Sequence, residues 1–331
     1  MRNNKFLKIL IVVFSFLILF SNNVVNVFAY SINSDDIYVG GMPAGFNFKT
    51  RGAYVAGLCD IIQNDIVYSP CKEAGILVGD VILNIDSQQV NTANDIEREI
   101  SDGNIKTLDI QRGENNYKFK VKPIKDALGK YKLGIFIRDG VNGIGTVTYI
   151  KGNVMATLGH PVLNDGKLMP IIGGNIYKCN ITGCVKGEKG TPGELRGIFF
   201  KKDEIANINK NTYSGVYGIV MSDFDLSNAR KIEKGTGRVG RAKIITTIEG
   251  DTPKEYNISI IKVDDNVIDG KNFVIKITDE NLLEKTNGIV QGMSGSPIIQ
   301  DDKLIGAVTH VFINDPTRGF GISIDNMLIN Q

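Results

Sequence analysis

Histidine and cysteine, the side chains that most often bind zinc, are scarce in this sequence. Its 331 residues include two histidines, and its four cysteines are Cys59, Cys71, Cys179 and Cys184. The cysteines show no Cys-x-x-Cys spacing, and neither histidine lies close in sequence to a cysteine. We therefore expect no metal site and no other cofactor, and we predict structural roles for the cysteines. The pattern is compatible with disulfides and with free thiols.

An excess of charge of either sign is also missing. The chain holds 38 Lys and Arg residues against 36 Asp and Glu residues. Arg2, Lys5 and Lys8 all lie in the first 29 residues, which contain no acidic residue, so the remainder is close to neutral. A near-neutral surface offers no general attraction for nucleic acid, and no nucleic-acid partner is expected.

The N-terminal apolar run is short for a membrane span. Residues 9–20 are apolar except for Ser15, and they number about 12 where a spanning helix needs roughly 18–20. The run follows a basic start and precedes Val27-Phe28-Ala29, which fits a small-residue cleavage site. Residues 1–29 therefore have the layout of a secretory signal. We predict either a cleaved signal peptide or a retained N-terminal membrane anchor, and export of the chain in both cases.

A short polar linker at residues 30–36 precedes the first predicted domain, residues 37–124. The stretch SPCKEAGILVGDVILNID predicts a turn, a short helix, a Gly-Asp turn and a strand. Thr92 followed by Asp95 resembles a capping box for a helix at 94–100, and two alternating strands close the domain. This stretch resembles the signature of PDZ domains in bacterial secreted proteases, which implies a small α+β PDZ domain.

The resemblance to PDZ domains implies a peptide-binding groove. Such domains bind an extended peptide as an added strand and hold its terminal carboxylate at a Gly-containing loop. By order in the chain, that loop would contain Ala44, Gly45 and Phe46, and the helix at 94–100 with Ile96 would form the opposite wall. In the alternative interpretation, GGMPAG is a plain turn and Phe46 is a core residue.

The remainder, residues 127–331, has a different character. Short runs rich in Val, Ile, Thr and Tyr, such as GIGTVTYI and RAKIITTIE, are separated by glycine, and only DENLLEKT is briefly helical. The sequence shows no repeat of fixed period and no low-complexity tract. This spacing predicts a β-barrel or double-barrel domain, so the chain as a whole should be mainly β.

The segment GIVQGMSGSPIIQDDKLIGAVTHV, residues 288–311, carries the candidate nucleophile. A strand follows its small-residue turn, which excludes the strand–turn–helix elbow of α/β-hydrolases. Trypsin-like proteases have the same order of turn, strand, hairpin and strand around their nucleophile. We therefore predict that Ser294 is the nucleophile and that the N–H groups of Gly292 and Ser294 form the oxyanion hole, with Gly295 leaving room for substrate. The alternative is an ordinary Gly/Ser turn.

A serine nucleophile needs a base within hydrogen-bond reach. His160 follows a strand-like run and opens a loop, as the base does in trypsin-like proteases, and it precedes the serine in the chain. His310 lies on the strand after the nucleophile hairpin. We predict that His160 is the base and that His310 lines the cleft or has a structural role.

Three segments resemble the SpoIVB peptidase family of spore-forming bacteria: GIFIRDGVNGIGTVTYI, ATLGHPV and the block from Asp279 to Ile322. The resemblance spans essentially the whole chain and implies a PDZ domain followed by a trypsin-like double β-barrel. It implies His160 as base, Ser294 as nucleophile and Asp279 as the acid. Asp279 also suits the N-cap of a helix. The alternatives for orienting His160 are Asp223, Asp225 or a group that is not an acid.

The position of the nucleophile also predicts specificity. In trypsin-like folds the floor of the P1 pocket lies about six residues before the serine, which is Gly288 here. Thr309, His310 and Val311, together with residues 319–322, would form the walls. Since Gly288 carries no charge, we expect cleavage after uncharged residues that are small or apolar.

The family resemblance implies a regulatory serine endopeptidase of sporulation. Such an enzyme acts in the space between the two membranes around the forespore, cleaves itself near its N-terminus and cuts a regulator in a membrane-bound signalling complex. That cut triggers processing of a sigma-factor precursor. Two alternatives are a non-catalytic PDZ protein that binds peptides in signalling, and a quality-control protease of the HtrA type.

Overall fold

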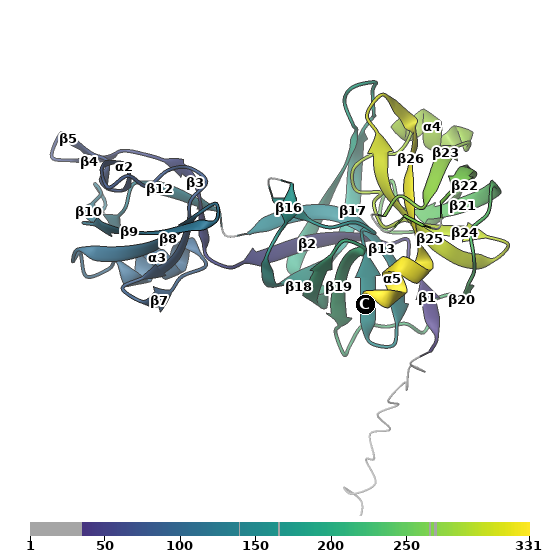
Figure 1. The fold of residues 1–331 in the computed structure, drawn as a ribbon, viewed down its shortest axis with the longest axis horizontal. Helices are drawn as coiled ribbons and strands as arrows, with labels where there is room; N and C mark the ends of the chain where they lie inside the picture. Colours follow the sequence, from purple (N-terminus) through teal and green to yellow (C-terminus); the bar gives the residue numbers. More distant parts are fainter. Residues whose placement is uncertain (1–34, 139, 165, 265, 268–269) are drawn as a thin grey trace, which may run out of the picture. The chain divides into compact units, whose positions relative to one another are not determined.

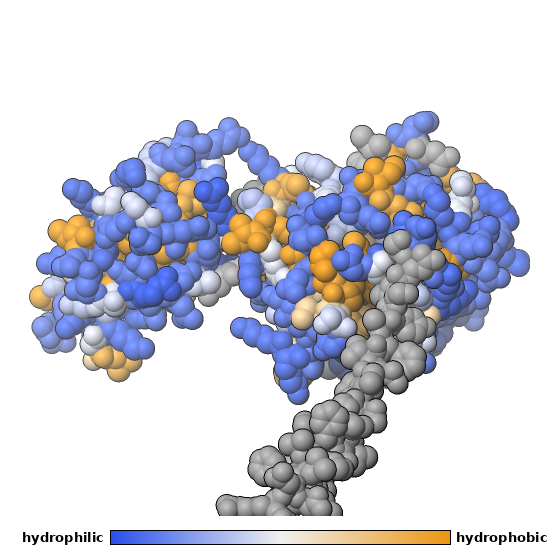
Figure 2. All heavy atoms as spheres, turned by 90° about the horizontal axis from the view of Figure 1, so that it is seen from below, coloured by the Kyte–Doolittle hydropathy of each residue, from blue (hydrophilic) through white to orange (hydrophobic). Residues whose placement is uncertain are grey.

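The computed structural model describes residues 35–138, 140–164, 166–264, 266–267 and 270–331 (Figure 1). The predicted signal or anchor at residues 1–29 lies outside these ranges. Over the described ranges, no helix is both long enough and apolar enough to cross a membrane. The face shown in Figure 2 is mostly hydrophilic, and its hydrophobic residues form separate patches.

Antiparallel strands from two distant parts of the chain close the first barrel. Around it, β2 pairs with β13 and β17, β18 pairs with β17 and β19, and β14 pairs with both β19 and β13. Its buried side chains include Phe46, Met155 and Ile176, whereas Tyr149 and Tyr217 pack in a cluster with residues from later in the chain, including Leu304 and Met327. The strands are β2 (Pro43–Thr50), β13 (Val141–Lys151), β14 (Val154–Thr157), β17 (Ile171–Val185), β18 (Glu194–Thr212) and β19 (Gly215–Val220).

The second barrel closes in the same way, because β25 pairs with both β24 and β26. Its core is built largely from isoleucine, with Phe273 and Met293 also fully buried. The elements are β20 (Lys231–Lys234), β21 (Gly240–Thr246), β22 (Lys254–Val263), β23 (Phe273–Ile277), α4 (Glu280–Thr286), β24 (Pro297–Gln300), β25 (Lys303–Phe312), β26 (Asp315–Ser323) and α5 (Ile324–Ile329). Strand β1 (Ile37–Val39) lies between β13 and β20 and so joins the two sheets. The predicted double β-barrel is confirmed.

A separate small sheet with two helices matches the predicted PDZ domain. Its strands follow the order β12-β3-β6-β8-β9, and α3 begins with the expected capping box between Thr92 and Asp95. The sheet contains β3 (Ala53–Leu58), β6 (Val81–Ile85), β7 (Gln88–Gln89), β8 (Lys106–Arg112), β9 (Asn115–Val121) and β12 (Ile135–Arg138). The other elements are β4 (Ile61–Gln63), β5 (Ile66–Tyr68), α2 (Pro70–Glu73), α3 (Ala93–Glu99), β10 (Ile124–Lys125) and β11 (Tyr131–Lys132). Two short strands, β15 (Leu163–Asn164) and β16 (Lys167–Leu168), form a hairpin after β14.

The boundary between the predicted domains requires a correction. Residues 37–50 were expected to open the PDZ domain, but they form β1 and β2 of the barrel region. Both edges of β2 are paired, and its Phe46 and Phe48 are buried and stacked with ring centroids 5.6 Å apart. The small sheet begins only at β3 and ends with β12, so the PDZ domain is inserted in the chain between β2 and β13 of the first barrel.

All four cysteines are free thiols. Burial is the main reason that the pKa of Cys71 is raised to about 12, and the neighbouring Cys59 adds to the effect. Burial also raises the pKa of Cys179 to about 11. These thiols therefore stay protonated near neutral pH and have little nucleophilic character.

Candidate active site

Ser294 lies in a tight turn between α4 and β24, flanked by Gly292 and Gly295. Both glycines have positive φ, 99° and 93°, in the region that favours glycine. The N–H groups of Met293, Gly295 and Ser296 all donate to backbone carbonyls. Within the described residues, the N–H groups of Gly292 and Ser294 donate to none. The two groups proposed for the oxyanion hole are therefore unoccupied donors on either side of Met293.

The first barrel supports this turn through strand β13. Thr146 donates from its N–H to the Ser294 carbonyl and from Oγ1 to the Gly292 carbonyl, both at 2.9 Å. Thr148 donates from Oγ1 to the Gly295 carbonyl at 2.8 Å. Both threonines are fully buried. Sequence reasoning missed them, although the Thr-x-Thr spacing in GTVTYI places both hydroxyls on one face of a strand.

Gly295 has a different role from the one expected. A Cβ atom at this position would lie 2.1 Å from the Thr146 carbonyl oxygen and 2.6 Å from the Leu158 nitrogen. The absent side chain therefore makes room for the first barrel, not for substrate. This close approach brings the Ser294 turn against the segment that carries His160.

His160 follows β14 after Leu158 and Gly159, which both have positive φ (65° and 69°) and turn the chain. Its Nδ1 lies 2.8 Å from the Pro161 carbonyl oxygen. A carbonyl only accepts hydrogen bonds, so in the neutral ring Nδ1 carries the proton and Nε2 keeps its lone pair. That is the tautomer required of a base that takes a proton at Nε2.

The environment keeps the His160 ring neutral. Burial lowers the pKa of His160, and the hydrogen bond to Pro161 opposes this only in part. The His160 and His310 rings lie 4.9 Å apart and are tilted by 38°. The structure thus brings the two histidines of the chain together.

The Ser294 hydroxyl does not point to His160. It donates to the Thr309 carbonyl at 2.8 Å, and no hydrogen bond within the described residues joins Ser294 to His160. Thr309 precedes the exposed His310 on β25. A side-chain rotation of Ser294 or His160 is needed before the proton can be transferred, as is common in sites without substrate.

The structure places the Asp279 carboxylate at the start of α4, and within the described residues no hydrogen bond or ion pair joins it to His160. Asp279 is the N-cap of α4, where one carboxylate oxygen accepts from the Leu282 N–H at 3.1 Å. The other oxygen accepts from the Asn257 N–H at 3.2 Å. The alternative Asp225 accepts instead from the Ser227 N–H. The group that orients His160 is the Pro161 carbonyl, which agrees with the alternative of a non-acidic partner.

Replacing Asp279 tests its capping role. Asn also caps helices well, so we expect Asp279→Asn to keep kcat/KM within about threefold of the wild type and to change the Tm little. Asp279→Ala should lower the free energy of unfolding by about 1 kcal/mol without changing kcat of the folded enzyme. Peptide hydrolysis and thermal unfolding measure the two effects. A loss of about 10⁴-fold in the Asn variant would instead identify a catalytic acid.

The comparisons with known proteins agree with this geometry. Residues 129–328 match the family described as SpoIVB peptidase S55, and residues 45–122 match the PDZ domain family. The chain belongs to the SpoIVB peptidase family. It is a serine peptidase with a PDZ domain, and its substrates are therefore proteins or peptides. No curated protein matches the chain.

Solved structures show weaker similarity. The PDZ domain of an SdrC-like protein from Listeria monocytogenes is 19% identical and covers 27% of this chain and 90% of its own, with a TM-score of 0.22. The inactive form of Rv3671c protease is 12% identical and covers 56% of this chain and 81% of its own, with a TM-score of 0.34. The active form, from M. tuberculosis, covers 58% and 73% at the same identity and TM-score. Scores this low give no basis for transferring a function.

The residues predicted to line the P1 pocket of this SpoIVB-family peptidase are closely packed. A Cβ atom at Gly288 would lie 2.1 Å from the Pro316 carbonyl oxygen, so no larger residue fits there. The next side chain, Ile289, is buried, and its Cδ1 would lie 2.7 Å from a Cβ atom at Gly319. Val311 pairs with Gly319 across the hairpin and packs against the same apolar cluster. Ile289 therefore belongs to the apolar core of the second barrel, directly after the predicted floor of the pocket.

Three of the four residues predicted to bind peptide lie outside the PDZ sheet. Ala44, Gly45 and Phe46 lie in β2 of the first barrel, where Ala44 and Phe46 are buried and Gly45 lies against the Phe199 ring. The alternative reading of Phe46 as a core residue is correct. Ile96 is buried in the core of the PDZ domain. Within the described residues, β12 has one unpaired edge at the end of its sheet.

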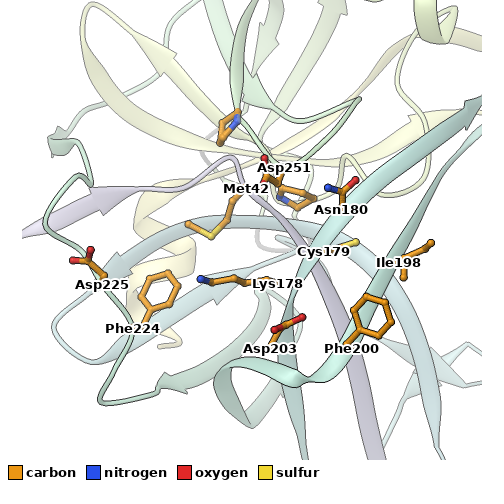
Figure 3. A pocket seen from close by; sticks show the side chains of 12 residues that line it. Met42, Lys178, Cys179, Asn180, Ile198, Phe200, Asp203, Phe224, Asp225 and Asp251 are labelled. Carbon is orange, nitrogen blue, oxygen red and sulfur yellow. The ribbon is translucent and has the colours of Figure 1, made fainter.

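A hollow of about 430 Å³ lies beside the first barrel and is lined also by Asp251 and Pro253, between β21 and β22; it contains none of the Ser294 site residues. Figure 3 shows its labelled side chains, among them Lys178 and Cys179 on β17 and Ile198 and Phe200 on the neighbouring strand β18. Asp225 lies at its rim beside Phe224. Across the described ranges, no cluster of residues suited to a metal ion was found.

Proposed function

We propose that this peptidase is a regulatory endopeptidase of sporulation, exported to the space between the two membranes of the forespore. It cleaves itself near the N-terminus and then cuts a regulator in a membrane-bound signalling complex, which triggers sigma-factor processing. Membership of the SpoIVB peptidase family supports this role. Residues 1–29 would act as a signal peptide or as an anchor that keeps the enzyme at the membrane.

The arrangement of Ser294 and His160 is the observation that carries the catalytic part of the proposal. His160 presents an unprotonated Nε2, and the Gly292 and Ser294 N–H groups are unoccupied donors beside the Ser294 hydroxyl. A non-catalytic signalling protein would have no need for these features together. The close packing of the residues predicted to line the P1 pocket favours selective cleavage over the broad degradation expected of a quality-control protease.

The PDZ domain has the accompanying role of peptide recognition in this proposal. The unpaired edge of β12 offers the backbone groups to which an extended peptide adds as a strand. The segment before it, Leu133-Gly134-Ile135, places a glycine with positive φ at the start of that edge. This segment replaces Ala44–Phe46 as the candidate carboxylate-binding loop. The bound peptide would be the enzyme's own N-terminal region or part of the substrate.

The experiment that tests the proposal is N-terminal sequencing of the full chain isolated from sporulating cells. The wild-type protein should begin downstream of residue 29 at a site created by its own activity, whereas Ser294→Ala should keep the longer N-terminus and fail to support sporulation. Ser259→Ala, in β22 of the same barrel, is the matched control. Identical N-termini with normal sporulation in Ser294→Ala would disprove it. Broad degradation of casein by the wild type would favour the quality-control function.

The P1 pocket gives a prediction of specificity. Peptides with Ala or Ser at P1 should be cleaved best, and Lys or Arg should be cleaved poorly because no charge lies at Gly288 or Ile289. Ile289→Ala should raise kcat/KM for a Leu peptide by roughly 10-fold or more relative to an Ala peptide, since each methylene in such a pocket is worth about 1–3 kcal/mol. A series of peptides that differ only at P1 measures this ratio. A wild-type preference for Lys or Arg would contradict the assignment of the pocket.

A further inference from the structure

The strands β17 and β18 extend beyond the first barrel. Strand β17 pairs with β2 only along residues 171–178, and β18 pairs with β19 only along residues 206–212. The parts nearer the hairpin tip pair with each other, and Figure 1 shows them reaching past the neighbouring strands toward β26. We call residues 179–199 the ribbon.

The ribbon is packed onto the second barrel. Ile181 and Leu195 are 2% and 6% exposed and belong to the apolar core of that barrel. Ile181 also exchanges two backbone hydrogen bonds with Gly250, at 2.7 and 2.9 Å. The ribbon is therefore a firm contact from one barrel to the other, with both apolar and backbone components.

Leu195 contacts the oxyanion-hole turn directly. Its N–H donates to the Gln291 carbonyl at 2.8 Å, and the Gln291 N–H donates to the Gly193 carbonyl at 2.8 Å. A Cβ atom at Gly292 would lie 3.0 Å from the Leu195 Cβ. Thr146 holds the Gly292 carbonyl, so the turn is held by the first barrel through both β13 and the ribbon.

The hydrogen bond from Leu195 fixes the direction of the Gly292 N–H. The Gln291 carbonyl and the Gly292 N–H belong to one peptide unit, which is trans like every described peptide bond. In a trans peptide the C=O and N–H vectors are opposed. Because the Gln291 carbonyl points to Leu195, the Gly292 N–H must point away from the ribbon. A flip of this peptide would break the Leu195 bond and remove one oxyanion donor.

The tip of the ribbon also holds the segments that flank the P1 pocket. The Gly187 N–H donates to the Thr286 carbonyl at 3.0 Å, and the Asn287 side chain donates to the Gly187 carbonyl at 2.6 Å. The Gly190 N–H donates to the Ile313 carbonyl at 2.8 Å. The chain before Gly288 and the loop between β25 and β26 are thus connected through the ribbon.

We propose that the ribbon controls the competence of the oxyanion hole, with Leu195 as the positioning residue. Docking of the ribbon holds the Gln291–Gly292 peptide in the orientation that offers its N–H to the substrate oxyanion. Undocking releases that peptide and inactivates the enzyme without touching Ser294 or His160. The inference rests on Ser294 as the nucleophile and adds a route by which a partner or a substrate could regulate it.

Two replacements at Leu195 separate backbone from side-chain effects. Leu195→Ala removes the apolar contact but keeps the backbone N–H. Leu195→Pro also removes the N–H that donates to the Gln291 carbonyl. Proline is tolerated near the start of a strand, where Leu195 lies. We expect kcat of the Pro variant to fall about 10²–10³-fold below that of the Ala variant, as for loss of one oxyanion donor, with KM nearly unchanged. A peptide aldehyde, whose adduct places an oxyanion in the hole, should lose affinity in parallel, whereas a non-covalent product peptide should not.

Thermal unfolding confirms which variants are folded, and Asn287→Gly provides a second test if the Pro variant does not fold. Glycine suits the left-handed conformation of Asn287 (φ 57°) and removes only the tether to Gly187. Its kcat should fall several-fold and its aldehyde affinity should fall in parallel. If the Leu195→Ala and Leu195→Pro variants are both folded and have equal kcat and equal affinity for the aldehyde, the proposed role of Leu195 is overturned. Wild-type kcat and aldehyde affinity in Asn287→Gly would overturn it as well. If the wild type is active and Ser294→Ala is not, the peptidase assignment would stand in either case.

Discussion

Ser294→Ala should abolish peptide hydrolysis by the purified chain, with a fall in kcat of about 10⁴–10⁶-fold. The reason is that Ser294 lies on the turn that carries the predicted oxyanion N–H groups and is the predicted nucleophile, with His160 as its predicted base. The oxyanion donors and substrate binding would remain and would account for the residual rate. Hydrolysis of a fluorogenic peptide with Ala at P1, followed under single-turnover conditions, measures the chemical step directly.

The stability of this variant should stay close to that of the wild type. Within the described residues, the hydroxyl of Ser294 makes one hydrogen bond, to the Thr309 carbonyl, so its loss should cost about 1 kcal/mol or less of unfolding free energy. A folded variant without activity separates a chemical role from a structural one, and Ser259→Ala serves again as the matched control. Activity retained in Ser294→Ala would show that residues 292–295 form an ordinary Gly/Ser turn, the alternative that the sequence also allows.

The architecture of the barrels follows from local patterns, but the limits of the PDZ domain do not. Alternating β-branched residues between glycines predicted a double barrel, and the capping box at Thr92 predicted the start of α3 within one residue. Strand β2 was assigned to the wrong domain because its pattern says only that it is a strand. Its partners β13 and β17 lie after the inserted domain, and nothing local identifies which sheet receives it.

In the active site, the roles of side chains could be predicted from the sequence, whereas a role of the backbone could not. Ser294 and His160 could be proposed from residue types and order, because the chemistry needs those particular side chains. The group that orients His160 is the carbonyl of Pro161, and every residue has a carbonyl, so the sequence carries no signal for it. The family resemblance implied Asp279 as the acid, and the structure shows it as a helix N-cap, the alternative that its sequence also allowed.

His160→Gln should lower kcat/KM by about 10²–10⁴-fold, the usual contribution of a general base. Glutamine is similar in size and can still donate a hydrogen bond to the Pro161 carbonyl, but its amide cannot take the proton from Ser294. The fall should appear mainly in kcat, because the ring is not expected to bind the substrate tightly. A loss confined to KM would show that His160 serves substrate binding, and the base would then have to be sought at His310.

The pH profile of the wild type tests the uncharged partner of His160. The neutral ring is the active form, and activity is lost as the pH falls through its pKa. Burial lowers that pKa below the ordinary value of about 6.5, and the hydrogen bond to the Pro161 carbonyl opposes this lowering only in part. We therefore expect kcat/KM to stay constant down to a pH below about 6.5 and then to fall with a slope of one proton. A carboxylate beside the ring would stabilise the imidazolium and move the acidic fall of kcat/KM toward higher pH. A midpoint of this fall at pH 7 or above would therefore mean that an acid joins the site when substrate binds.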